Sequence, residues 1–228
     1  NFLFDWSLKL SQNLTNSLRI DFSASNNSIV KNYFQNDPDE NRVVNKDLDI
    51  WDGFWNTGEA NSHNQSFRLS YQLPFKFFPL INFVNSSYNY SGDFNWERGS
   101  DAMAQVQDDS GKFLGRVNTI QNANTHTFNT SFNMSKFYIN LGLIKKKNPK
   151  SVQHKILNSV IGLATGLTRL KVNYSENNGK VLPGYTQSLG FLGTARPSLG
   201  FVFGSQADVR FEAAKNGYYS LSSLNPRS

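Results

Sequence analysis

The chain contains no cysteine, so disulfide frameworks, thiolate catalysis and cysteine-based zinc sites are excluded for these 228 residues. It also lacks long hydrophobic runs. The longest mostly apolar stretch, Ile156 to Leu167, is interrupted by Asn158, Ser159 and Thr165. It is far shorter than the roughly twenty apolar residues that a membrane-spanning helix needs. The sequence therefore predicts no transmembrane helix.

Apolar residues are scarce overall, whereas aromatic residues are plentiful. The hydrophobic fraction is 38% and the mean hydropathy is −0.49, which is typical of a soluble protein. Phe, Tyr and Trp nevertheless make up 14% of the chain. A transmembrane β-barrel accounts for both values, because every second strand residue faces a wet lumen. A soluble β-sandwich alternates in the same way, so composition leaves both classes open.

The net charge of +6 does not indicate a nucleic-acid partner. The densest basic run, Lys145 to Lys147 followed by Lys150, is not interleaved with stacking aromatic residues. We interpret the run as a solvated connection. Contact with acidic lipid headgroups is the alternative.

Polar and apolar residues alternate most clearly from Val84 to Glu97. Every odd position in this segment is polar, and five of the seven even positions are apolar or aromatic. Side chains of a strand point to opposite faces in turn, so the pattern predicts one dry and one wet face. Strands of soluble proteins usually stop at about five or six residues, whereas about 9–11 cross a bilayer obliquely. The length of the segment therefore favours a membrane strand.

The same alternation predicts an all-β membrane protein built from antiparallel transmembrane β-barrel strands, with short helices in the connections. We predict strands at residues 2–11, 16–25, 64–73, 81–97, 119–135 and 168–176. The connections 30–61, 99–118 and 145–166 are expected to be partly helical, and 177–228 to be a loop and strand region. Helical spacing of Leu48, Trp51 and Trp55 predicts one amphipathic helix, and Ser151 to Gly166 predicts a second. The tryptophans fit either a membrane interface or packing against a neighbouring loop.

The alternation also assigns side chains to the lumen and to lipid. A basic residue at mid-depth in lipid costs about 2–4 kcal/mol, so charged residues are expected on the wet face. The residues predicted to face the lumen are Arg19, Asp21, Arg68, Asn85, Ser87, Asn89, Ser91 and Asp93. The residues predicted to face lipid are Phe4, Trp6, Phe22, Phe67, Tyr71, Tyr88, Tyr90, Phe94 and Trp96.

The sequence offers no convincing set of catalytic, metal-binding or cofactor-binding residues. His63, His126 and His154 are isolated from one another and from carboxylates at metal-ligand spacing. Asp108 and Asp109 lack the spaced ligands and closing Glu of a calcium loop, and fit a turn better. We therefore expect that the protein is not an enzyme and uses no cofactor.

Longer motifs near the end of the chain resemble one family. The runs Val172 to Gly179, Leu182 to Tyr185, Pro197 to Gln206 and Val209 to Ala214 are similar to the C-terminal part of the SprA/Sov family. These are outer-membrane translocons of the Bacteroidota type 9 secretion system, studied largely through gliding motility. Asp5-Trp6, Ile50-Trp51 and the segment Leu73 to Pro79 resemble the same family in the same order. The motif positions that we single out are Pro183, Gly184, Tyr185, Gly200, Phe203, Gly204, Gln206, Arg210 and Glu212.

The resemblance implies a wall segment of one very large barrel in the bacterial outer membrane. Such a barrel passes folded cargo that carries a C-terminal targeting domain. Its partners would be the rest of the translocon barrel, a PorV-type porin-like protein at a lateral opening, a periplasmic plug protein and outer-membrane lipid. Because the chain begins at Asn1 without an initiator Met or a leader, we expect it to be part of a longer precursor.

Two alternatives remain from the residues themselves. The first is a smaller porin or receptor barrel, which would need about eight strands, more than the roughly six that the connections leave room for. The second is a soluble β-sandwich that binds glycans. In that protein Trp51, Trp55 and Trp96 would stack on sugars.

Overall fold

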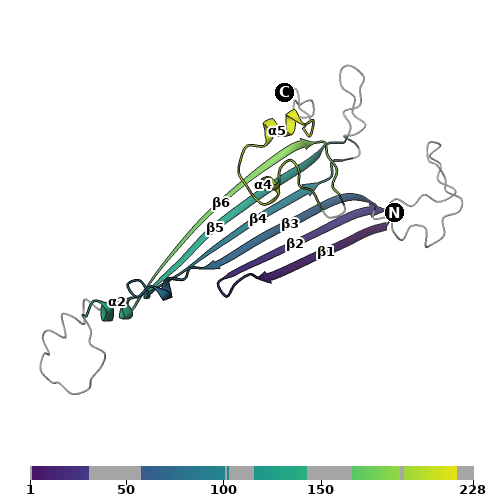
Figure 1. Cartoon of the computed structure of the whole chain (residues 1–228). Helices are drawn as coiled ribbons and strands as arrows, with labels where there is room; N and C mark the ends of the chain where they lie inside the picture. The colour runs from purple at the N-terminus through teal and green to yellow at the C-terminus, as the bar shows by residue number, and fades with distance from the viewer. Residues whose placement is uncertain are drawn as a thin grey trace, which may run out of the picture.

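Six long antiparallel strands dominate the structure, a computed structural model that describes residues 2–30, 58–100, 102, 116–142, 166–190 and 193–219. Each strand pairs with its neighbour in the chain, so the sheet order is β1-β2-β3-β4-β5-β6 (Figure 1). The strands are β1 (Phe2–Asn13), β2 (Leu18–Val30), β3 (Glu59–Gln72), β4 (Val84–Glu97), β5 (Asn118–Asn133) and β6 (Arg169–Tyr185). The described helices are short: η1 (Phe75–Phe77), α2 (Met134–Asn140), α4 (Leu199–Val202) and α5 (Arg210–Lys215).

Each strand overlaps one of the six ranges predicted from alternation, but three strands run well past the predicted ends. β2 continues to Val30, β3 already begins at Glu59, and β6 extends to Tyr185 instead of ending near residue 176. In β6 the polar run Asn177 to Gly179, whose composition is typical of a turn, pairs regularly with β5. The predicted amphipathic helix around Leu48 to Trp55 lies outside the described residues. So does the one predicted at Ser151 to Gly166, apart from its last residue, and most of 99–118.

The pairing register places the two predicted sets of side chains on opposite faces of the sheet. Directly paired residues of an antiparallel sheet share a face. Asp21 pairs with Arg68, which pairs with Ser91, and the other predicted lumen residues lie on that same face. We call it the polar face. The nine residues predicted to face lipid all lie on the opposite face, which we call the mixed face because polar residues join them toward one end.

The sheet does not close on itself. Among the described residues no strand pairs with the outer edge of β1, and the outer edge of β6 has only the isolated bridge between Tyr185 and Tyr219. Exposed edges this long present rows of backbone donors and acceptors that other strands can pair with. Separately, no helix in the described ranges is long and apolar enough to span a membrane.

The two ends of the sheet differ in what surrounds them (Figure 1). At one end the chain leaves β6 and turns back over the mixed face. We call residues 186–219 the C-terminal segment and this end the covered end. The opposite end, the turn end, carries the short connection 14–17, the connection 73–83 with η1, and α2.

Candidate functional site: a polar face, an apolar band and a covered end

Side chains of the polar face hydrogen-bond to one another across strands. Asn95 Nδ2 donates to Asn64 Oδ1 at 2.7 Å, and Gln121 Nε2 donates to Asn95 Oδ1 at 3.1 Å. Elsewhere on this face the Arg19 guanidinium forms an ion pair with Asp21 at 2.9 Å. These groups are largely exposed and already partnered. The face is therefore a hydrated surface with few unmet hydrogen-bonding demands.

The mixed face carries exposed apolar side chains from the turn end toward the middle of the sheet. On β6 the side chains of Leu170, Val172 and Tyr174 are 42%, 50% and 54% exposed. Phe128 on β5 is also exposed, and so are Leu8 and Leu10 on β1. Patches of this kind on a protein surface mark contact with a membrane or with another protein.

These exposed apolar residues form a band that crosses the strands obliquely. Following the register from Leu8 through Ala24, Gln65, Phe94 and Asn122 leads to Lys180 on β6. The apolar residues of β6, however, centre on Val172, eight positions before Lys180. Counted from Leu8 the apolar band is thus displaced by eight residues over five strand-to-strand steps, and counted from Leu10, which is in register with Asn178, by six.

A membrane barrel produces a displacement of this size. Its strands tilt by about 35–45° from the membrane normal, and neighbouring strands lie about 4.8 Å apart with a rise of about 3.4 Å per residue. A belt parallel to the membrane then shifts by about 1.2 residues per strand, or about six residues over five steps. The oblique band therefore has the geometry of a horizontal belt on tilted strands.

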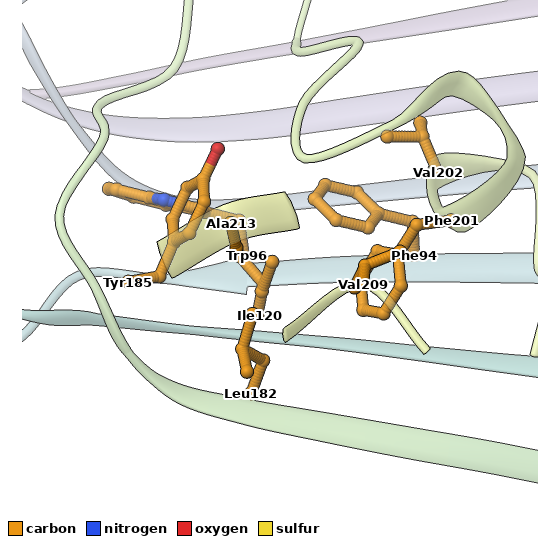
Figure 2. Packing of buried hydrophobic residues seen from close by; sticks show 9 residues of the cluster. All are labelled: Phe94, Trp96, Ile120, Leu182, Tyr185, Phe201, Val202, Val209 and Ala213. Atoms are coloured by element: carbon orange, nitrogen blue, oxygen red, sulfur yellow. The ribbon is translucent and has the colours of Figure 1, made fainter. Parts of the chain in front are cut away.

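Beyond the band, the mixed face is buried beneath the C-terminal segment. A cluster of nine buried side chains joins the sheet to this segment (Figure 2): Phe94, Trp96, Ile120, Leu182, Tyr185, Phe201, Val202, Val209 and Ala213. The rings of Phe94 and Phe201 meet edge to face, with centroids 6.2 Å apart. Burial of this apolar surface is the main contribution that holds the segment on the sheet.

This packing corrects two assignments made from the sequence. Phe94 and Trp96 were predicted to face lipid, but each is only 2% exposed and lies against protein. Phe67 of the same predicted set is half-buried and packs against Phe203, with centroids 5.5 Å apart. Alternation placed all three side chains among the residues predicted to face lipid because it reports only which face of the sheet a residue occupies. It does not report how far along each strand the exposed apolar band extends.

A row of asparagine side chains binds the backbone of the C-terminal segment. Asn122 Nδ2 donates to the carbonyl oxygens of Phe201 at 2.9 Å and Ser205 at 2.8 Å. Asn124 Nδ2 donates to the carbonyl of Gly204 at 2.7 Å. Each such bond contributes about 0.5–1.5 kcal/mol net, but an unpaired buried carbonyl would cost more. Asn122 and Asn124, which interrupt the apolar residues of the mixed face, thus bind the backbone of the same chain.

Two glycines allow the segment to lie directly on β4. A Cβ atom added at Gly92 would lie 2.1 Å from the carbonyl oxygen of Phe203. Gly204 has a φ of +92°, and a Cβ there would lie 2.8 Å from the Cα of Gly92. The two backbones therefore touch at a point where no side chain fits. Tyr90, two residues before Gly92, donates its hydroxyl hydrogen to the carbonyl of Phe203.

The structure brings most of the predicted motif positions to the covered end. Tyr185 is fully buried in the core, and Gln206 Nε2 donates to Asn122 Oδ1 at 3.2 Å and to the Gly204 carbonyl at 3.1 Å. Lys180 Nζ hydrogen-bonds the Gln206 carbonyl. The motif positions on or beside the contact are Pro183, Gly184, Tyr185, Gly200, Phe203, Gly204 and Gln206.

The last two motif positions, Arg210 and Glu212, lie exposed on α5. Arg210 forms a bidentate pair with Asp208, with hydrogen bonds of 3.0 and 2.8 Å from its Nε and Nη2 atoms. Hydrogen bonds from Arg210 lower the pKa of Asp208. Both groups are at the surface, so the pair orders the start of α5 without contributing much stability.

Sequence reasoning missed the sheet side of this contact, namely Gly92, Asn122, Asn124 and Lys180. A signal was present, because Gly92 interrupts an otherwise largely aromatic row in β4. Asn122 and Asn124 are a similar signal, because they place polar amides on the same face of β5 as the apolar Phe128.

The described residues do not assemble a metal site: within them no three His, Cys, Asp or Glu side chains gather closely enough to hold an ion. His126 Nδ1 is 2.8 Å from the Tyr88 hydroxyl, and His63 is buried near Trp6, with ring centroids 6.0 Å apart. His154 lies outside the described part of the chain.

A scan against protein-family models and a search of curated proteins each found no match to this chain.

Proposed function

We propose that this chain is part of the wall of a protein-conducting β-barrel in the outer membrane, the translocon of the type 9 secretion system. The observation that carries the proposal is the oblique apolar band on one face, set against a hydrogen-bonded polar face on the other. We propose this particular barrel because the motifs around Pro183 and Gly204 resemble the SprA/Sov family.

The open edges of the sheet support a larger barrel over a small one. Every backbone polar group of a membrane strand must be paired, because lipid offers no partner. β1 and β6 each present an outer edge that lacks a partner strand among the described residues. We infer that neighbouring strands of the same barrel complete both edges, so this sheet is an arc of the wall.

The polar face would serve as the lining of the conduit. Most of its Asn, Ser and Thr side chains are partly exposed, and many bond to each other across strands, as Thr125 Oγ1 does to Asn177 Oδ1 at 2.7 Å. Passing protein therefore meets hydrated groups whose bonding needs are met, and gains little by adhering to them. The wall acts passively, and energy for export comes from elsewhere.

We also propose the partners that this function implies. They are the rest of the translocon barrel, a PorV-type porin-like protein at the lateral opening, a periplasmic plug protein, and cargo with a C-terminal targeting domain.

Photo-crosslinking tests the conduit directly. A photoreactive amino acid at Asn89, on the polar face, is expected to crosslink to cargo carrying the C-terminal targeting domain while secretion is active. The same probe at Tyr88, the adjacent position on the mixed face, is the matched control and should give no cargo adduct. Cargo adducts from Tyr88 but not from Asn89, or from neither position in a secreting cell, would refute the proposed lining.

A further inference from the structure

The turn end of the sheet carries a second exposed apolar surface, separate from the band on the strands. The connection 73–83 exposes Phe77, Phe78 and Leu80 by 72%, 55% and 87%. The neighbouring helix α2 adds Ile139, and Leu141 follows it, at 41% and 56%. Side chains this apolar in a short turn and a single helix have no packing role inside the described fold.

The connection and the helix form one unit, which we call the turn platform (residues 73–83 and 134–142). Phe83 and Phe137 pack with ring centroids 4.8 Å apart. Asn140 Nδ2 donates to Asn82 Oδ1 at 3.1 Å, and Asn133 caps the first turn of α2 by accepting from Lys136 N at 3.1 Å. The exposed apolar side chains are therefore held on a fixed scaffold.

Charge on and around the turn platform has one sign. Residues 13–18, 73–87, 128–142 and 166–175 contain no Asp or Glu. They contain four basic residues, all exposed: Lys76, Lys136, Arg169 and Lys171. The covered end, by contrast, mixes both signs, as with Asp208 and Arg210. Exposed apolar side chains beside basic residues, with no acidic residue among them, fit a membrane surface. Such a surface is apolar in its interior and negatively charged at its headgroups.

We propose that the turn platform binds the anionic phospholipid headgroups of the membrane leaflet at this end of the strands, with Lys76 and Lys136 contacting phosphate. This inference rests on the proposed membrane function. The platform adjoins the start of the apolar band at Leu170, which is in register with Val84 through Phe132, so a bilayer that covers the band reaches the platform at its headgroup level.

The test uses the full-length protein in vesicles of phosphatidylcholine with or without phosphatidylglycerol. A fluorophore on Leu80→Cys reports contact with lipids that carry a quencher near the headgroup. We expect quenching by both labelled lipids, and stronger quenching by labelled phosphatidylglycerol. In Lys76→Gln/Lys136→Gln the preference for phosphatidylglycerol should fall by about tenfold, because each basic residue near an anionic surface adds to binding.

The control variant Lys9→Gln/Lys215→Gln removes the same charge away from the platform and should keep the preference. A second label on Val172→Cys, read with a quencher on the lipid acyl chain because this position lies in the apolar band, separates the two proposals. Quenching at Val172 without quenching at Leu80 would overturn the platform as a lipid site and assign it to a protein partner. Equal quenching by both lipids at Leu80 would overturn the selectivity for anionic headgroups. An absence of quenching at both positions would overturn the membrane function itself.

Discussion

A Gly92→Val variant is expected to release the C-terminal segment from the sheet. The new Cβ would lie 2.1 Å from the carbonyl oxygen of Phe203, and a backbone atom cannot move aside as a flexible side chain can. Overpacking of this kind costs about 1–3 kcal/mol or more. A loss of about 2 kcal/mol raises the detached population about thirtyfold, and proteolysis of an open state follows that population.

Limited trypsin digestion of the full-length protein in detergent measures this release. Cleavage after Arg210 and Lys215, scored by mass spectrometry, should accelerate by the same order in Gly92→Val. Ser91→Val is the matched control because its side chain lies on the polar face, away from the segment. Cleavage rates that are equal in both variants and the parent protein would mean that the segment does not rest on β4 at Gly92.

Tyr88→Arg is expected to lower the amount of protein assembled in the outer membrane by about tenfold or more. Tyr88 lies in the apolar band, where it packs on Phe128 with ring centroids 4.7 Å apart. A basic residue at mid-depth in lipid costs about 2–4 kcal/mol. Asn89→Arg places the same charge on the polar face, beside water, and assembly should be close to that of the parent protein.

Recovery of protease-resistant protein from outer membranes checks this pair. Tyr88→Leu separates the two causes, because it removes the ring and the hydrogen bond to His126 without adding charge. Assembly of Tyr88→Leu should lie near that of the parent. If Tyr88→Arg and Asn89→Arg assembled equally well, the two faces would not differ in their surroundings.

Alternation predicted the strands and their two faces because the physical cause is local. Successive side chains of a strand point to opposite faces, so the sequence of β4 alone shows which residues share a face. The pairing register depends on how all the strands assemble, so it could not be taken from the sequence. It shows the offset of the apolar residues from one strand to the next that makes the band oblique. Phe94 and Trp96 were assigned to lipid for that reason, although they lie beyond the band and under protein.

The covered end could be predicted only in part. The motifs around Tyr185 and Gly204 were identified through their resemblance to a family, without any indication that they contact the sheet. Alternation places Asn122 and Asn124 on the mixed face, but it does not show that they bind backbone carbonyls 79 and 80 residues further along the chain. Contacts over such separations depend on where the chain returns, which local composition does not encode.

The buried cluster at the covered end also bears on the soluble β-sandwich, the alternative that composition left open. A sandwich would bury the mixed face along its whole length. Here the C-terminal segment covers only one end, and Val172 and Tyr174 remain half exposed. Trp96, one of the residues expected to stack on sugars in that alternative, is 2% exposed and donates its indole hydrogen to the Gln187 carbonyl at 3.3 Å. The exposed apolar surface instead favours an apolar surrounding medium.

Spin-label accessibility along β6 tests most directly the proposal that the apolar band faces a membrane. Nitroxide labels on single cysteines at positions 170 to 175, with one at Phe94, would be exposed to oxygen, which concentrates in lipid, and to a water-soluble nickel complex. We predict that labels at Leu170, Val172 and Tyr174 respond to oxygen. Those at Lys171, Asn173 and Ser175 should respond to nickel, and the label at Phe94 to neither. Uniform access of nickel to all six β6 positions in the membrane-embedded protein would contradict the account.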